Sequence, residues 1–166
     1  MPIYNFRFNH PNGGPGLFPP GLAFAGAFMP VEIHVPPQMA DLLTRDGKPV
    51  PDGVSGVAII DTGATFTSID ESILKGLGLA SVGPIVSGTA NGPAVHQMYP
   101  ARIVFPTIPG FDVNAQQAVG VNLTGQAIPT APKQPPQRIV ALIGRNLLAN
   151  WLFVWNGPAG QWSISF

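Results

Sequence analysis

The sequence contains no cysteine among its 166 residues. This absence excludes both a disulfide framework and a thiolate metal site. The three histidines, His10, His34 and His96, are far apart in the sequence and form no ligand motif with acidic residues. We therefore expect no metal and no cofactor, and we interpret the histidines as surface or strand-face residues.

Charged residues are scarce. They make up 10% of the chain, with eight basic and eight acidic side chains, so that the formal net charge is zero. No cluster of Lys or Arg provides the basic surface that binding to phosphate backbones requires. Nucleic acid is therefore not an expected partner.

Long apolar runs are also missing, since no stretch reaches the roughly 18 residues of a membrane-spanning helix. The apolar segment 16–29 is interrupted by Pro19-Pro20 and by several glycines. We expect this segment to be a coil packed against the domain rather than a cleaved signal peptide. The expected protein is soluble and has no membrane span, and a cytoplasmic location is favoured over a secreted one.

Glycine and proline are abundant, with twenty residues of each. Together with the lack of helix-favouring runs, they predict an all-β fold with many turns and one or two short helices. The length suits one domain. We expect an irregular N-terminal extension over residues 1–30, with one strand where Tyr4, Phe6 and Phe8 alternate with polar residues, and the main domain over residues 31–166.

Alternation and turn signals predict the other elements. We expect strands at 31–35, 54–60, 82–87, 94–105, 113–121, 139–143, 151–155 and 162–166, helices at 71–77 and 145–150, one helical turn at 39–44, and an exposed loop at 122–137.

One predicted strand ends in a carboxylate. Four apolar residues, 57–60, are typical of a strand that is covered on both faces, and Asp61, Thr62 and Gly63 follow it directly. A carboxylate at the end of a buried strand is costly unless hydrogen bonds satisfy it, which raises the question of its use. Asp61 is either a capped turn residue or a catalytic group.

Two segments resemble the signatures of a known family. Asp61-Thr62-Gly63-Ala64 after an apolar strand resembles the active-site signature of aspartic proteases. The segment 139–148, an apolar strand followed by Gly-Arg-Asn and a predicted helix, resembles the second signature of the single-domain, retropepsin-like branch, and the loop Asn-Gly-Pro-Ala-Gly near the end resembles bacterial members. The resemblance implies a retropepsin-like acid protease barrel over residues 31–166.

The resemblance also implies a catalytic mechanism. Aspartic proteases activate a water molecule between two carboxylates, and two-lobed members carry two Asp-Thr/Ser-Gly signatures, whereas this chain has one. Both carboxylates would then be Asp61, one from each subunit of a homodimer. Thr62 would be a hydroxyl clamp between the subunits, Gly63 would bring its N–H toward the carboxylates, and Ala64 would line the substrate cleft.

Asn91-Gly92 between two extended runs predicts a hairpin, because both residue types tolerate positive φ. In retropepsin-like proteins, the hairpin between the two signatures is the flap that closes over bound peptide. Asn91 and Gly92 would then form the flap tip and contact substrate. A surface hairpin without a role is the alternative.

The sequence departs from the retroviral pattern at Thr65. Retroviral members carry an acid at this position, and it pairs with the Arg of Gly-Arg-Asn, here Arg145. Asp70 or a main-chain carbonyl is expected to replace that partner. Ile143 and Gly144 are expected to support the catalytic loop from below, and the alternating C-terminal strand resembles the terminal strands that interleave across the family's dimers.

Taken together, these features predict an aspartic endopeptidase that acts on extended peptides or proteins. The alternative is a non-catalytic module that keeps the fold for dimerisation or peptide binding. A processing segment of a larger polyprotein is also compatible with the Gly/Pro-rich start.

Overall fold

The computed structural model describes residues 2–7, 19–89, 92–128 and 135–166. Its strands are β1 (Ile3–Arg7), β2 (Phe28–His34), β3 (Val54–Ile60), β4 (Ser68–Asp70), β5 (Gly83–Thr89), β6 (Gly92–Val104), β7 (Asp112–Val121), β8 (Ala127–Ile128), β9 (Gln137–Ile143), β10 (Leu152–Asn156) and β11 (Gln161–Ser165). Its helices are α1 (Pro19–Ala25), α2 (Pro37–Arg45), α3 (Glu71–Gly76), α4 (Arg145–Leu148) and the 3₁₀ helix η1 (Gly157–Ala159). The all-β prediction is confirmed, with four short α-helices in this part of the chain rather than one or two.

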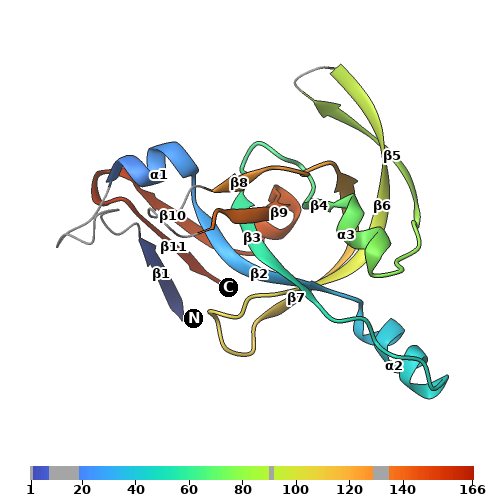
Figure 1. Cartoon of the computed structure of the whole chain (residues 1–166). Coiled ribbons are helices and arrows are strands. Elements are labelled where there is room, and N and C mark those ends of the chain that lie inside the picture. Colours follow the sequence, from blue (N-terminus) through green and yellow to red (C-terminus); the bar gives the residue numbers. More distant parts are fainter. Residues whose placement is uncertain (1, 8–18, 90–91, 129–134) are drawn as a thin grey trace.

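A closed barrel forms the body of the protein (Figure 1). Its strands follow the order β2-β3-β9-β4-β7-β6, and antiparallel pairing of β2 with β6 closes the ring. Alternating residues of β2, namely Met29, Val31 and Ile33, are buried in the core. The barrel expected from the resemblance is thus confirmed.

The two signature strands are neighbours in this barrel. Strands β3 and β9 pair in parallel, with Ile59 beside Leu142 and Ile60 beside Ile143. Their carboxyl ends therefore meet at the same edge of the sheet. This pairing places Asp61, which follows β3, next to Gly144, which follows β9.

Strands β5 and β6 form the predicted hairpin, which extends away from the barrel (Figure 1). Their pairing runs from Gly83 with Met98 to Thr89 with Gly92. Gly92 has φ +104°, in the region that favours glycine. Asn91, one of the two predicted tip residues, lies outside the described residues.

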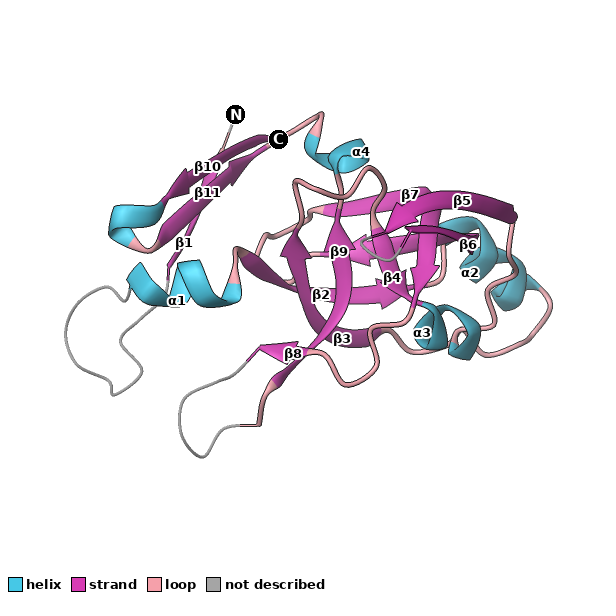
Figure 2. Cartoon of the chain, turned by 90° about the horizontal axis from the view of Figure 1, so that it is seen from above, coloured by secondary structure: helices cyan, strands magenta, loops and turns pink. Residues whose placement is uncertain are grey.

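A second, three-stranded sheet has the order β1-β11-β10 and lies beside the barrel (Figure 2). One face packs against the core through residues that include Trp162 and Ile164. The other face carries Ile3, Leu152 and Val154, whose exposed fractions are 63%, 54% and 46%. The prediction of a buried strand at 151–155 is therefore wrong in its burial, because β10 is an edge strand with one open face.

Two segments are more ordered than the sequence predicted. Helix α1 lies within the stretch expected to be irregular. It can form because Pro19 and Pro20 occupy its first turn, where proline is tolerated, and because Leu22 is fully buried. The expected exposed loop at 122–137 contains the buried side chains of Leu123 and Ile128. These two pack in a small cluster with residues of β3 and β9.

The buried carboxylate of Asp70, at the end of β4, connects the start of α3 to strand β9. Asp70 is 1% exposed, and its Oδ1 accepts hydrogen bonds from the backbone N–H and the hydroxyl of Ser72 at the start of α3. Its Oδ2 lies 3.1 Å from Nη2 of Arg138 on β9. Burial opposes ionisation, but the hydrogen bonds from Ser72 and Arg138 outweigh it and hold the pKa of Asp70 below its ordinary 3.8.

We expect the unfolding free energies of the wild type and of Asp70→Asn to differ by an amount that depends on pH. Because the native pKa is lowered, ionised Asp70 stabilises the fold above about pH 4, and this contribution is lost as the pH falls through the native pKa. Asp70→Asn should lower the unfolding free energy by about 1–3 kcal/mol at neutral pH. In urea titrations, its difference from the wild type should shrink as the pH falls toward about 2. A difference that stays constant over this range would contradict the assignment, and exposed Asp52→Asn is the control.

In the part of the chain that the structure describes, no helix is long and apolar enough to cross a membrane.

Candidate active site

Asp61 is held by the turn that it begins. Its backbone N–H donates to the carbonyl oxygen of Ile143 at 3.0 Å. Its Oδ1 accepts hydrogen bonds from the N–H groups of Gly63 at 2.9 Å and Ala64 at 3.1 Å. Among the described residues, none donates a hydrogen bond to the other oxygen, Oδ2. One carboxylate oxygen is therefore fixed by the main chain, and the other is available for chemistry.

Close packing explains the glycine at position 63. A Cβ there would lie 3.1 Å from Oδ1 of Asp61, which is tighter than ordinary contact. The glycine lets the backbone N–H approach the carboxylate, as the resemblance implied. Thr62 lies on the same turn with its side chain exposed.

Arg145 on α4 holds the turn from the other side. Its Nη1 donates to the carbonyl oxygens of Thr62 at 3.0 Å and Gly63 at 3.1 Å, and its Nη2 donates to the hydroxyl of Thr65 at 2.8 Å. Of the two partners expected to replace the missing acid, main-chain carbonyls take that place, whereas Asp70 binds Arg138. All three acceptors are neutral, so protonation of a carboxylate partner cannot release the guanidinium.

A hydrogen-bond network that the sequence did not predict connects the two signatures. The side-chain oxygen of Asn146 accepts hydrogen bonds from the backbone N–H of Thr67 at 2.7 Å and from its hydroxyl at 2.9 Å. The Thr67 hydroxyl in turn accepts from the N–H of Gly144 at 3.1 Å. Asn146 was visible as part of Gly-Arg-Asn, but no local pattern marked Thr67.

Gly144 has no room for a side chain. A Cβ at this position would lie 2.4 Å from the carbonyl carbon of Phe66 and 2.7 Å from the backbone nitrogen of Thr67, so the main chain would have to move.

Gly144→Ala should therefore lower the unfolding free energy by about 1–3 kcal/mol, measured by urea titration. Gly76→Ala is the matched control, because a Cβ there meets nothing within 4 Å. Equal stability of Gly144→Ala and the wild type would contradict this close packing.

A cleft of about 710 Å³ lies between this turn and the β5–β6 hairpin. Asp61 is the only carboxylate among the described residues that line it, and the lining is otherwise uncharged except for His96. Several side chains give the cleft apolar walls: Ala64, Phe66, Val86, Val119, Val121 and Leu142.

The structure brings some of the predicted site residues together and leaves others apart. Asp61, Gly63 and Ala64 line the cleft, and Val86, Ser87 and Gly88 of the hairpin also line it. Thr62 and Gly92 are not among the lining residues, although both belong to the turn and hairpin that border the cleft. In the described ranges, no group of three or more His, Asp or Glu side chains could hold a metal ion.

Comparison with known proteins gives one match. A family model described as aspartyl protease matches residues 47–147, a range that covers more than half of the chain and contains Asp61, the hairpin and Gly144-Arg145-Asn146. Searches of curated proteins and of solved structures found no match.

Proposed function

Because the chain belongs to the aspartyl protease family, we propose that it is an aspartic endopeptidase that acts as a homodimer. The observation that carries this proposal is the lone carboxylate of Asp61 in a cleft bordered by a hairpin. Acid–base hydrolysis of a peptide bond by this chemistry needs two carboxylates with different protonation states. A second copy of the chain would supply the second one.

The proposed reaction begins with a water molecule between the two Asp61 carboxylates. Two carboxylates about 3 Å apart cannot both ionise, so the pair shares one proton and titrates as a unit. The ionised member takes a proton from the water as the water attacks the peptide carbonyl, and the protonated member donates its proton to the developing oxyanion. The hydrogen bonds from Gly63 and Ala64 to Oδ1 keep each carboxylate in position.

The proposed substrate is an extended peptide that lies between the hairpin and the floor of the cleft. Main-chain hydrogen bonds would hold it, and the apolar walls, Ala64 among them, would accept its side chains. We place Asn91 and Gly92 at the tip of a flap that closes over the peptide. The exposed hydroxyl of Thr62 is our proposed contact between the two catalytic loops.

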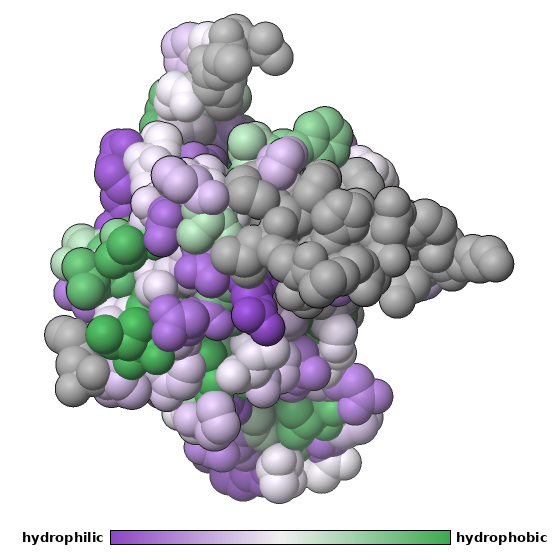
Figure 3. All heavy atoms as spheres, turned by 90° about the vertical axis from the view of Figure 1, so that its left-hand side faces the viewer, coloured by the Kyte–Doolittle hydropathy of each residue, from purple (hydrophilic) through white to green (hydrophobic). Residues whose placement is uncertain are grey.

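The terminal sheet provides the proposed dimer surface. Its outer face exposes Ile3, Leu152 and Val154 around a groove of about 280 Å³. Figure 3 shows this side of the molecule, where apolar patches interrupt the polar surface. Strand β10 follows shortly after α4, whose Arg145 holds the catalytic turn. Dimer contacts at this sheet would therefore help to fix the position of that turn.

A peptide-cleavage assay across pH tests the proposed function. A mixture of unstructured peptides incubated between about pH 3 and pH 8 should be cut most rapidly on the acid side of neutrality, because one carboxylate of the pair must stay protonated. Mass spectrometry identifies the products. Failure to cut any peptide at any pH would favour the non-catalytic binding module.

A further inference from the structure

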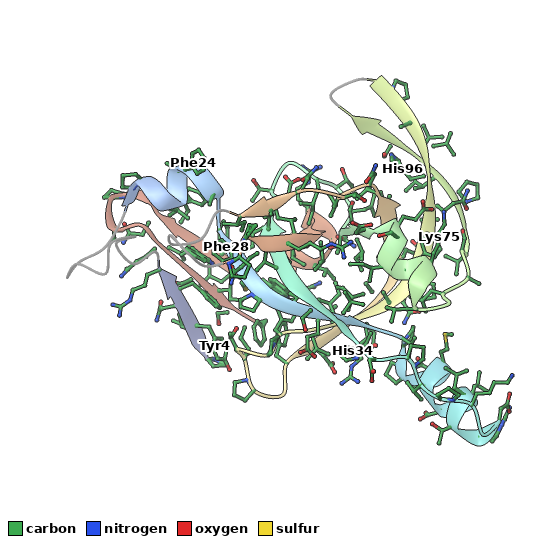
Figure 4. The ribbon with its side chains drawn as sticks, in the orientation of Figure 1. Tyr4, Phe24, Phe28, His34, Lys75 and His96 are labelled. Carbon is green, nitrogen blue, oxygen red and sulfur yellow. The ribbon has the colours of Figure 1, made fainter. Side chains whose placement is uncertain are left out.

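One titratable side chain in the cleft has no role in the proposed mechanism. His96 lies on β6 in the hairpin (Figure 4) and is half-buried. It lines the same cleft as Asp61. Its Nδ1 lies 3.2 Å from the carbonyl oxygen of Gly120 on β7. Because a carbonyl oxygen only accepts hydrogen bonds, Nδ1 carries a proton, and the ring is held in one orientation. No described residue hydrogen-bonds to the other ring nitrogen, Nε2.

The charged groups near His96 are engaged with other side chains. Glu71 on α3 interacts electrostatically with His96, but its carboxylate is bound by Nζ of Lys75 at 3.0 Å and by the hydroxyl of Tyr99 at 2.8 Å. The described residues of β5 carry no charge, and the acid of β7, Asp112, pairs with Arg102 at the far end of that strand. Asp61 across the cleft is committed to the water and its partner carboxylate in the proposed mechanism.

We propose that His96 is a specificity residue whose imidazolium Nε2–H binds an acidic side chain of the substrate. The inference rests on the proposed peptidase function. Apart from Asp61 and His96 itself, no charged residue is among the described residues that line the cleft. A charged donor there favours a carboxylate partner over a neutral one, since charge-assisted hydrogen bonds are the stronger kind.

The symmetry of the proposed dimer sharpens this inference. A homodimer presents two copies of His96 related by a two-fold axis through the catalytic pair. The preference for Asp or Glu should therefore appear at equal distances on the two sides of the scissile bond. The remaining positions should favour apolar side chains, in keeping with the other walls of the cleft.

Matched peptide pairs test the proposal. Peptides that differ only by Glu or Gln at each position in turn are compared by kcat/KM at about pH 5. At the two symmetric positions, the wild type should cut the Glu peptide about tenfold better than the Gln peptide, because the charge-assisted hydrogen bond from His96 is lost with Gln. In His96→Gln, this preference for the Glu peptide should disappear. His34→Gln is the matched control and should keep it, because His34 lies on β2 beside Glu32 and well apart from His96 (Figure 4).

Two outcomes would overturn the proposal while leaving the peptidase intact: cleavage without a Glu preference, or a preference that survives in His96→Gln. If the wild type cuts no peptide, the peptidase function fails instead, and binding then decides the role of His96. In Asp61→Asn protein, an NMR titration of the His96 ring should give a higher pKa with the Glu peptide bound than with the Gln peptide. Equal values would overturn the proposal.

Discussion

Replacement of Asp61 by Asn should abolish peptide hydrolysis and leave the fold unchanged. The Asn side-chain oxygen can still accept the hydrogen bonds that Gly63 and Ala64 donate to Oδ1, so the turn should keep its shape. What disappears is the ionisable group that takes a proton from water, and the expected loss in kcat is about 10³-fold. Cleavage rates and thermal melting of the same preparations measure both effects.

A distant carboxylate provides the control for this variant. Asp41→Asn changes an exposed residue of α2 and should keep both activity and stability. Activity of Asp61→Asn comparable to that of the wild type would exclude the proposed mechanism. A loss of activity together with unfolding would instead mean that the carboxylate is needed by the turn.

A charged patch on the terminal sheet should separate the subunits and remove activity. Leu152 and Val154 are 54% and 46% exposed in the single chain, so the double change to Glu should cost the monomer little. In the proposed dimer, the same change buries unpaired like charges, which should cost about 3 kcal/mol and weaken the dimer by roughly a hundredfold. The dimer fraction from sedimentation velocity and the cleavage rate, measured at the same concentrations, should fall together.

The control for this variant is Leu42→Glu on α2, a similarly exposed apolar residue far from the terminal sheet (Figure 1). It should remain dimeric and active. A Leu152→Glu/Val154→Glu protein that stays dimeric would move the interface to another surface. A fully active monomer would contradict a site shared between subunits.

The catalytic strand and its partner were predictable because their patterns are local. Four apolar residues followed by Asp61 define the end of β3, and the strand before Gly144 repeats that outline. The parallel pairing of β3 with β9 then explains why the two signatures belong together. The hairpin was predictable from Asn91-Gly92, although Asn91 itself lies outside the described residues.

The features that the sequence did not reveal depend on tertiary contacts. Nothing in the local sequence distinguishes Thr67 from other threonines, because its partners Asn146 and Gly144 are distant in the chain. The exposure of Leu152 depends on which face of β10 packs against the barrel, and alternation alone cannot distinguish a core from an interface. His96 was interpreted as a strand-face residue, and only the position of the hairpin places it in the cleft with Asp61.

The central claim is that one active site uses two copies of Asp61. It can be tested by equilibrating wild-type chains with increasing amounts of Asp61→Asn chains and measuring cleavage per wild-type chain. In an equal mixture, about a quarter of the dimers carry two Asp61 residues, so activity per wild-type chain should fall in proportion to the wild-type fraction. Activity per wild-type chain that stays constant at every ratio would show that each chain works alone and would contradict the claim.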